Sequence, residues 1–203
     1  LNSKELNITK CIFNDNIIDN KNIEYNVEKE IVTIDLGNII NPGIHKITIQ
    51  YQGILNDQMA GFYRSKYGND KYLATTQFEA VDARRALPCM DEPSHKAIFK
   101  ISINVPENLI ALSNTEVINQ ISENGRKIFY FNETPLMSTY LLAFFVGEAD
   151  YTESFATIGN KNIPVRVYTP IGESKKGVFA RELCVKVLEF FSEYFDIDYP
   201  LNK

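Results

Sequence analysis

The stretch "KAIFKISINVP", residues 96–106, alternates apolar and polar side chains along most of its length. Its apolar positions fall on one face of an extended chain: Ala97, Phe99, Ile101, Ile103 and Val105. This period of two predicts a half-buried β-strand with one face against a core. Proline lacks a backbone N–H, so Pro106 ends the pairing.

Similar patterns continue along the chain to about residue 156. In "HKITIQYQG" (45–53), three apolar residues alternate with polar ones in the same way. Further strands are predicted at residues 30–36, 109–113, 115–121, 127–132 and 139–146. Turn residues separate the strands at "NPG" (41–43), "YGND" (67–70) and "ENG" (123–125). We therefore predict a mainly β domain over residues 1–156, built as an antiparallel sandwich or a large curved sheet.

The pattern changes after residue 156. "IPVRVYTP" (163–170) predicts one more strand, closed by a proline. The next thirty or so residues carry apolar side chains at helical spacing: Phe179, Leu183, Val187, Phe190, Phe191 and Tyr194. Gly172 and Ser174 suit the start of this helix, and Pro200 follows its end. We interpret residues 157–203 as the start of a second domain that is cut short.

Composition excludes several classes of protein. The 203 residues are 44% hydrophobic and 23% charged, which is typical of a globular chain. A net charge of −5 gives no electrostatic reason to expect nucleic acid or an anionic membrane as a partner. The longest apolar run, residues 141–146, is too short to span a bilayer, so we expect no membrane segment.

The three cysteines are Cys11, Cys89 and Cys184, an odd number at wide spacing. They suggest neither a disulfide framework nor a zinc ribbon, which favours a reducing compartment, and we expect a cytoplasmic protein. Two glycosylation-type triplets, at residues 7–9 and 132–134, are a weak cue for the less favoured secreted or membrane-anchored alternative.

Residues 75–100, "TTQFEAVDARRALPCMDEPSHKAIFK", concentrate charged residues in an otherwise strand-like chain. Gln77 and Glu79 stand two apart at the end of a predicted strand, so their side chains share a face and Phe78 takes the other. On the inward face of a sheet, such a polar pair would need a partner or a ligand. The structural alternative is that Glu79 pairs with Arg84 or Arg85 in a solvated turn.

No complete catalytic apparatus can be assembled from these residues. The chain has only two histidines, His45 and His95, so neither an H-E-x-x-H zinc helix nor a Ser-His-Asp set is present. No glycine-rich phosphate loop follows a strand. We therefore predict no catalytic residue and no metal ligand within these 203 residues.

Six stretches, in this order, resemble a known family: "GFYRS" (61–65), "TQFEAVDARRALPCMDEPSHKAIFKISI" (76–103), "ALSN" (111–114), "STYLLAFFVGE" (138–148), "PVRVYTP" (164–170) and "YFDIDYPLNK" (194–203). The chain resembles the amino-terminal domain of the gluzincin-clan zinc aminopeptidases, the group of puromycin-sensitive aminopeptidase, aminopeptidase N and the tricorn-interacting aminopeptidases. The resemblance covers nearly the whole chain, and its central motif is long and specific.

The resemblance implies a saddle-like β domain followed by the first strand and helix of a thermolysin-like α/β catalytic domain. It also implies that the chain is a fragment truncated at both ends. The family's G-x-M-E-N segment and its zinc-binding H-E-x-x-H helix would then lie in the missing catalytic domain, which is the intramolecular partner of this part. Zinc is expected in the full-length enzyme, and none is expected on the fragment, which should be inactive alone.

The resemblance also assigns roles to two residues. Glu79 matches the glutamate that anchors the free amine of a peptide substrate, and Gln77 matches a residue lining the pocket for the first side chain. A fixed carboxylate that binds the cationic α-amine admits only chain ends, which explains aminopeptidase activity. The family often has a cis peptide bond after this glutamate, here Glu79–Ala80. Its remaining motif residues are expected to brace Glu79: Asp82, Arg84, Arg85, Asp91 and Glu92.

A second hypothesis is a non-catalytic scaffold or interaction module of the same architecture, since the family includes a transcription-factor subunit without the zinc site. The intact "TQFEA" motif favours the enzyme, because a scaffold needs no amine anchor. The presence or absence of the two catalytic motifs after residue 203 would discriminate between these hypotheses.

Overall fold

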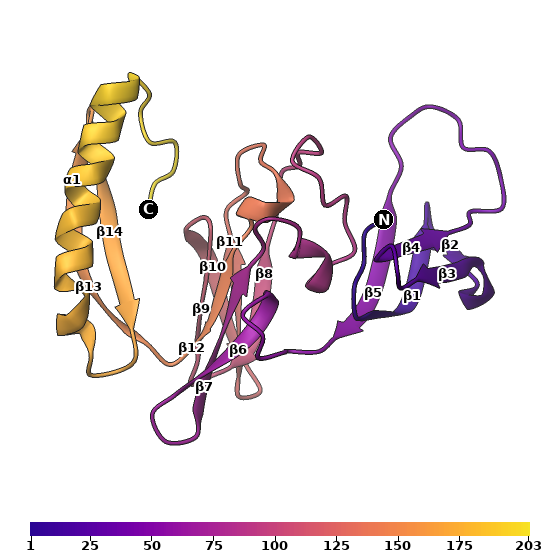
Figure 1. Ribbon diagram of the computed structural model, residues 1–203, viewed down its shortest axis with the longest axis horizontal. Coiled ribbons are helices and arrows are strands. Elements are labelled where there is room, and N and C mark those ends of the chain that lie inside the picture. The colour runs from indigo at the N-terminus through magenta and orange to yellow at the C-terminus, as the bar shows by residue number, and fades with distance from the viewer. The chain divides into compact units, whose positions relative to one another are not determined.

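The computed structural model describes all residues, 1–203, and confirms a mainly β chain with antiparallel sheets and one C-terminal α-helix (Figure 1). The chain folds into two compact units. Unit 1 comprises residues 1–65, 74–97 and 136–143, and unit 2 comprises residues 66–73, 98–135 and 144–203.

Unit 1 contains two small antiparallel sheets. In the first, β1 (Leu6–Phe13) lies between β2 (Asn16–Ile18) and β5 (Ile47–Gly53). The second is a hairpin of β3 (Ile23–Asn26) and β4 (Ile31–Ile34), preceded by the 3-10 helix η1 (Asn20–Asn22). Each sheet has one apolar face, and these faces bury each other in a core of Ile8, Cys11, Val32, Ile18, Ile23, Ile34 and Ile49.

The chain then forms the hairpin of β6 (Gly61–Tyr67) and β7 (Lys71–Gln77). The N-terminal part of β6 and the C-terminal part of β7 belong to unit 1, as do the 3-10 helices η2 (Ala83–Arg85) and η3 (Thr139–Leu141). The tip of the hairpin, residues 66–73, belongs to unit 2. The charged stretch of the sequence, residues 75–100, thus begins in the last part of β7 and continues beyond the end of this strand.

Unit 2 contains the predicted sandwich. One sheet has the order β10 (Val117–Glu123), β11 (Arg126–Phe131), β8 (Ser102–Pro106), and β9 (Ile110–Ser113) pairs antiparallel with β12 (Phe144–Gly147). Side chains of β8, β9, β11 and β12 pack into one core: Val105, Ala111, Phe129 and Phe131, with Ile101, Ile103, Leu109 and Val146 around them. The alternation of residues 99–105 thus points its apolar face inward, as predicted.

The last part of unit 2 is a hairpin of β13 (Asp150–Ile158) and β14 (Lys161–Thr169) with a helix against it. The 3-10 helix η4 (Ser174–Gly177) leads into α1 (Val178–Phe195), which ends at Asp196 in the left-handed conformation with φ 53°. Hairpin and helix share a core of Ala156, Ile158, Ile163, Val165, Val185, Leu188 and Tyr199. The predicted strand and helix are both present.

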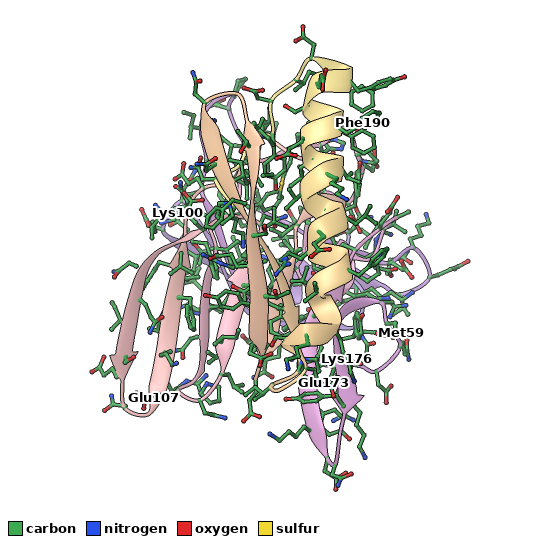
Figure 2. The ribbon with its side chains drawn as sticks, turned by 90° about the vertical axis from the view of Figure 1, so that its left-hand side faces the viewer. Met59, Lys100, Glu107, Glu173, Lys176 and Phe190 are labelled. Atoms are coloured by element: carbon green, nitrogen blue, oxygen red, sulfur yellow. The ribbon has the colours of Figure 1, made fainter.

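The apolar residues that predicted α1 lie largely on its exposed side. Phe179, Phe190 and Tyr194 are 76%, 56% and 69% exposed, and Figure 2 shows Phe190 on the side of the helix away from the two strands. The ring of Phe190 stacks on that of Tyr194 with centroids 5.5 Å apart. The helical period was therefore correct, whereas the side packed against the hairpin is formed by Val185 and Leu188.

Two predicted strands are shorter than expected. Residues 139–141 form η3, and the strand expected from residue 139 begins only at Phe144, because Thr139 turns inward and donates to the buried carboxylate of Asp91. Regular pairing of the opening stretch begins at Ser102. Before it, the N–H of Phe99 is taken by the side-chain oxygen of Thr134 (2.9 Å), which interrupts the ladder.

The predicted boundary between residues 156 and 157 falls inside β13, which pairs with β14 along its whole length. The division of the chain at that point stays a prediction. No helix of the structure is both long enough and apolar enough to cross a membrane.

Candidate functional site

Gln77 and Glu79 lie at the C-terminal end of β7. Gln77 is the last residue of the strand, and burial alternates from there, since Phe78 is 2% exposed while Gln77 and Glu79 are both exposed. The Gln77 amide donates to the backbone carbonyl of Glu79 (Nε2 to O, 3.3 Å). The shared face is therefore as predicted, but the inward orientation is wrong: this polar pair faces outward and bears no burial cost.

The peptide bond Glu79–Ala80 is cis, as the family resemblance implied. The alternative in which Glu79 pairs with a nearby arginine is wrong. Arg84 instead pairs with Asp91 (Nε to Oδ2, 3.0 Å), and Arg85 pairs with Asp82 (Nε to Oδ1, 2.8 Å). The Glu79 carboxylate takes part in no ion pair within the chain, so it is available to a cationic ligand.

A compact turn follows Glu79. The N–H of Asp82 donates to the carbonyl of Phe78 (2.9 Å), and the N–H of Arg85 donates to the carbonyl of Asp82 (3.1 Å). The 3-10 helix η2 continues this turn, with Ala83 fully buried. Because Phe78 is buried on one side of Glu79 and Ala83 on the other, both ends of the segment that carries the carboxylate are fixed.

Both arginines of η2 also reach residues that are remote in sequence. Arg84 donates to Glu30 (Nη1 to Oε2, 3.2 Å), and Arg85 donates to Glu5 (Nη1 to Oε2, 3.0 Å). Glu5 and Glu30 have φ of 58° and 53°, a left-handed conformation that is uncommon for residues other than glycine. Neither acidic partner was predicted, because no local pattern marks a contact across 54 or 80 positions.

Four of the five residues expected to brace Glu79 are ion-paired with one another, as Arg84–Asp91 and Arg85–Asp82, and Glu92 lies outside these pairs. Its side chain is 68% exposed, and its nearest basic partner is His95 at 3.8 Å. Its neighbour Asp91 is 2% exposed and is the single charged side chain among the buried polar residues. The structural alternative, in which the acidic residues form a solvated, ion-paired turn, is thus wrong for the buried Asp91, whereas Asp82 is ion-paired and Glu92 is exposed as it expects.

The ion pairs of Glu30 give a pH dependence. Its carboxylate accepts from the Lys4 ammonium and also pairs with Arg84, and these contacts hold the pKa of Glu30 below its ordinary value of 4.5 despite partial burial. The folded protein therefore binds fewer protons at this group than the unfolded chain does. Its contribution to stability is complete above pH 4.5 and is lost as the pH falls through the lower folded pKa.

We therefore expect Glu30→Gln to have a lower free energy of unfolding than the wild type near neutral pH. The difference should shrink as the pH falls from about 5 to about 3, because the wild-type carboxylate then becomes protonated as well. Urea unfolding of both proteins across this range measures the difference. The exposed, unpaired Glu28 provides the control, Glu28→Gln; a Glu30→Gln difference that stays constant with pH would contradict the assignment.

The three cysteines are all free, and the structure places them in different environments. Cys11 is fully buried, and Cys89 is 9% exposed. Burial, aided by the charge of Asp91, raises the pKa of Cys89 to about 12. Cys184 on α1 is exposed.

Under native conditions we expect one thiol, that of Cys184, to react rapidly with an alkylating or disulfide reagent. At pH 8 only about one Cys89 side chain in 10⁴ would be ionised, and the thiolate is the reactive form. Counting modified thiols by mass spectrometry before and after unfolding tests this. Cys184→Ser should remove the rapid reaction, and a second rapid equivalent in the folded chain would show that the burial of Cys89 or Cys11 is wrong.

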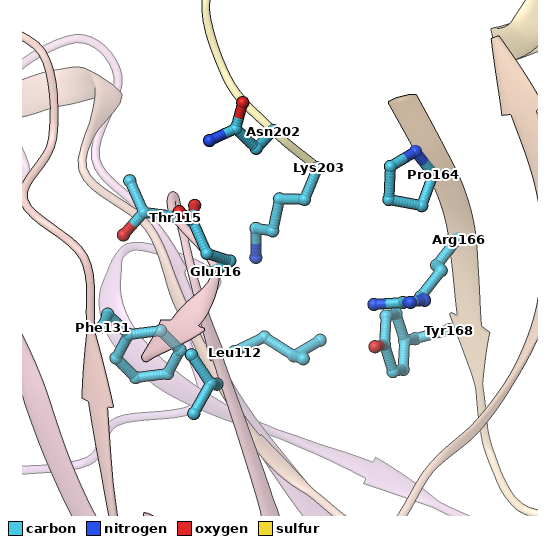
Figure 3. Close-up of a pocket in the computed structure, with 10 residues that line it drawn as sticks. Leu112, Thr115, Glu116, Phe131, Pro164, Arg166, Tyr168, Asn202 and Lys203 are labelled. Atoms are coloured by element: carbon cyan, nitrogen blue, oxygen red, sulfur yellow. The ribbon is translucent and has the colours of Figure 1, made fainter. Parts of the chain in front are cut away.

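A separate pocket of about 430 Å³ lies in unit 2 (Figure 3). Lys203 extends into it between Glu116 on one side and Arg166 on the other. Its charged groups already have partners, since Arg166 donates to Glu153 (Nε to Oε2, 2.5 Å) and Lys203 donates to the Ser113 carbonyl. Burial lowers the pKa of Lys203. Neither Gln77 nor Glu79 lines this pocket.

The chain brings together no group of three or more His, Cys, Asp or Glu side chains suited to a metal ion. His45 stacks on Phe13 and bonds to Asn14, and His95 lies beside Glu92. The residues present therefore do not fit a zinc site, which requires three or four such ligands.

Comparison with known proteins gives the family. The model of the peptidase M1 N-terminal domain matches residues 1–141. Aminopeptidase M1-A of Oryza sativa subsp. japonica is 50% identical over 179 residues, which are 87% of this chain and 20% of that protein. Alanine/arginine aminopeptidase of Saccharomyces cerevisiae is 45% identical over 214 residues, covering 100% of this chain and 24% of its own length. Puromycin-sensitive aminopeptidase of Caenorhabditis elegans is 41% identical over 185 residues, 88% of this chain and 19% of that protein.

The chain thus spans about a fifth of the length of the relatives that it matches. All three relatives are named as aminopeptidases. The matched domain covers more than two thirds of the residues, and it includes the β7 end, the turn and η2. The chain therefore belongs to the peptidase M1 family, whose N-terminal domain it carries.

Proposed function

We propose that the full-length protein is a zinc-dependent aminopeptidase and that this chain supplies its substrate-anchoring wall. In this proposal Glu79 binds the free α-amine of a peptide, and Gln77 lines the pocket for the first side chain. The observation that carries the proposal is the exposed carboxylate of Glu79, unpaired within the chain and mounted on a turn whose two ends are buried. The names of the relatives support it.

The chemistry of the proposed anchor follows from charge. A peptide amino terminus is a cation at neutral pH, whereas every internal residue offers only a neutral amide. A carboxylate held at one place forms a charge-assisted hydrogen bond with the ammonium and so fixes which peptide bond lies at the reacting centre. The Gln77 amide nitrogen is bonded to the Glu79 carbonyl, which leaves the amide oxygen of Gln77 free of that bond. Internal peptide segments lack the charge and would bind out of register.

Because no metal-ligand group lies in this chain, the zinc of the proposed enzyme would be held by residues outside it. We accordingly propose that the 203 residues alone have no peptidase activity. Hydrolysis of an aminoacyl-anilide by the purified chain in the presence of zinc, at a rate that a chelator abolishes, would overturn this. We also propose that the protein works in the cytoplasm, a reducing compartment, which its three free cysteines support.

The full-length protein tests the proposed activity directly. It should release nitroaniline from alanine 4-nitroanilide, lose this activity on treatment with 1,10-phenanthroline, and regain it with added zinc. N-acetyl-alanine 4-nitroanilide, which lacks the ammonium, should be a poor substrate. Equal rates on the two substrates would exclude an amine anchor, and a folded full-length protein without hydrolysis would favour the scaffold alternative.

A further inference from the structure

Asp91 is the buried charge closest in sequence to the turn that carries Glu79, and both of its carboxylate oxygens are engaged by the chain. Its Oδ2 accepts from both the backbone N–H and Nε of Arg84, at 3.2 and 3.0 Å. Its Oδ1 accepts from the Thr139 hydroxyl at 2.9 Å. Its own N–H donates to the Asn2 side chain at 3.1 Å. One residue thus joins segments that lie 48 and 89 positions away.

Arg84 links Asp91 to η2, because it belongs to this helix and its side chain pairs with the Asp91 carboxylate. Its side chain is 13% exposed and lies between two carboxylates, those of Asp91 and Glu30. Its backbone is held as well, because its carbonyl accepts from the Lys4 N–H at 2.9 Å. The middle residue of a three-residue helix is therefore fixed through its side chain, its N–H and its carbonyl.

Arg84 lies in η2, directly after the turn that contains Glu79. The bond from the Asp82 N–H to the Phe78 carbonyl closes that turn around Glu79. The two residues directly after Glu79 are not held by burial, since Ala80 is exposed and Val81 is 46% exposed, and the nearest buried residue after them is Ala83 of η2. The orientation of the Glu79 side chain is thus set by the buried Phe78 before it and by η2 after it.

A buried ion pair of this kind is poorly explained by stability alone. Moving charges out of water is costly, and well-packed apolar residues often stabilise a fold as well as a buried pair does. What the charges add is direction, because one oxygen of Asp91 accepts from both the backbone N–H and the Nε of Arg84, which fixes the side chain of Arg84 relative to its own backbone.

We propose that Asp91 is a positioning residue: through Arg84 it holds the turn after β7 in the one conformation that aims Glu79 at the substrate amine. The inference rests on the proposed function of Glu79 and adds to it a residue that touches no substrate. Thr139 shares the role, because its hydroxyl orients the Asp91 carboxylate toward Arg84.

The test is a double-mutant cycle in the full-length protein, read as kcat/KM on alanine 4-nitroanilide. Asp91→Asn keeps the size of the side chain and removes its charge, and we expect a loss of about 10- to 100-fold, typical of a displaced reacting group. Glu79→Ala with Asp91→Asn should be no less active than Glu79→Ala alone, because the misplaced group is already absent. Glu92→Gln, which changes the exposed carboxylate next in sequence, should retain wild-type activity.

Two variants of Thr139 provide a second test in case Asp91→Asn does not fold. Thr139→Val removes the hydroxyl at nearly constant shape and should lower kcat/KM, whereas Thr139→Ser keeps the hydroxyl and should restore it. A double mutant that loses activity by the product of the two single losses would overturn the positioning role, and so would wild-type activity of both Asp91→Asn and Thr139→Val. If Glu79→Ala itself is fully active, the proposed function fails instead, so the two failures are distinguishable.

Discussion

Replacing Glu79 by alanine in the full-length protein should lower kcat/KM for a substrate with a free amino terminus by about 30- to 5,000-fold. This corresponds to about 2 to 5 kcal/mol of lost transition-state stabilisation, the range found when one partner of a close charge pair is removed. The loss should be large because the acidic residues near Glu79 are already paired with arginines and cannot replace it as the anchor. Steady-state kinetics on alanine 4-nitroanilide measures it.

The effect should depend on the charge of the substrate. N-acetyl-alanine 4-nitroanilide makes no use of the anchor, so its low rate of hydrolysis should be the same in the wild type and in Glu79→Ala. Glu79→Gln keeps the shape and removes the charge, and it should resemble Glu79→Ala more than the wild type. Glu92→Ala is the matched control on an exposed glutamate of the same region. Wild-type turnover by Glu79→Ala would remove Glu79 from the site.

Gly61→Ala should be the most destabilising single change near the turn, at about 2 to 4 kcal/mol of unfolding free energy. Gly61 has φ +71°, where a side chain is disfavoured, and an added Cβ would stand 2.5 Å from the Cβ of Arg85. Both atoms of that contact are close to the backbone, so no flexible side-chain end can yield. The clash would displace η2 and the Asp82–Arg85 pair with it.

Gly37→Ala separates the cost of a side chain at positive φ from the cost of the steric clash with Arg85. Gly37 also belongs to unit 1 and has φ +72°, but an added Cβ would meet nothing within 4 Å. It should therefore cost only the conformational part, about 1 to 2 kcal/mol. Urea unfolding of both variants measures the difference, and equal losses would show that the contact with Arg85 is not as close as described.

Local pattern was enough to predict most of the secondary structure. The period of two in residues 99–105 reports a property of each strand by itself, because alternate side chains face alternate sides. The helix over residues 178–195 was predicted by the same kind of rule. The rule failed at residues 139–141, where a hydroxyl bond to Asp91 replaced the expected strand. It also left open which side of α1 is packed, since apolar residues occur on both sides.

The candidate site was predicted in part. The motif around residue 79 named Gln77 and Glu79 and implied the cis bond that the structure contains. It did not show that "GFYRS" (61–65) contributes the glycine against which Arg85 packs. It also did not reveal Glu5 and Glu30, whose only sequence signal is an acidic residue in a turn. These contacts join positions 24 to 80 residues apart, and periodicity carries no information at that separation.

By itself the sequence determined that this protein is a chain of antiparallel strands followed by one helix, and that its unusual chemistry lies in the stretch after Thr75. Only the tertiary structure decided which charges are paired and that the Glu79 carboxylate is not. Arg84 and Arg85 are each within a few residues of Glu79, yet both are engaged by carboxylates that the fold delivers from other segments. Pairing among charges depends on distance in space, so the unpaired state of Glu79 became visible only once the chain was folded.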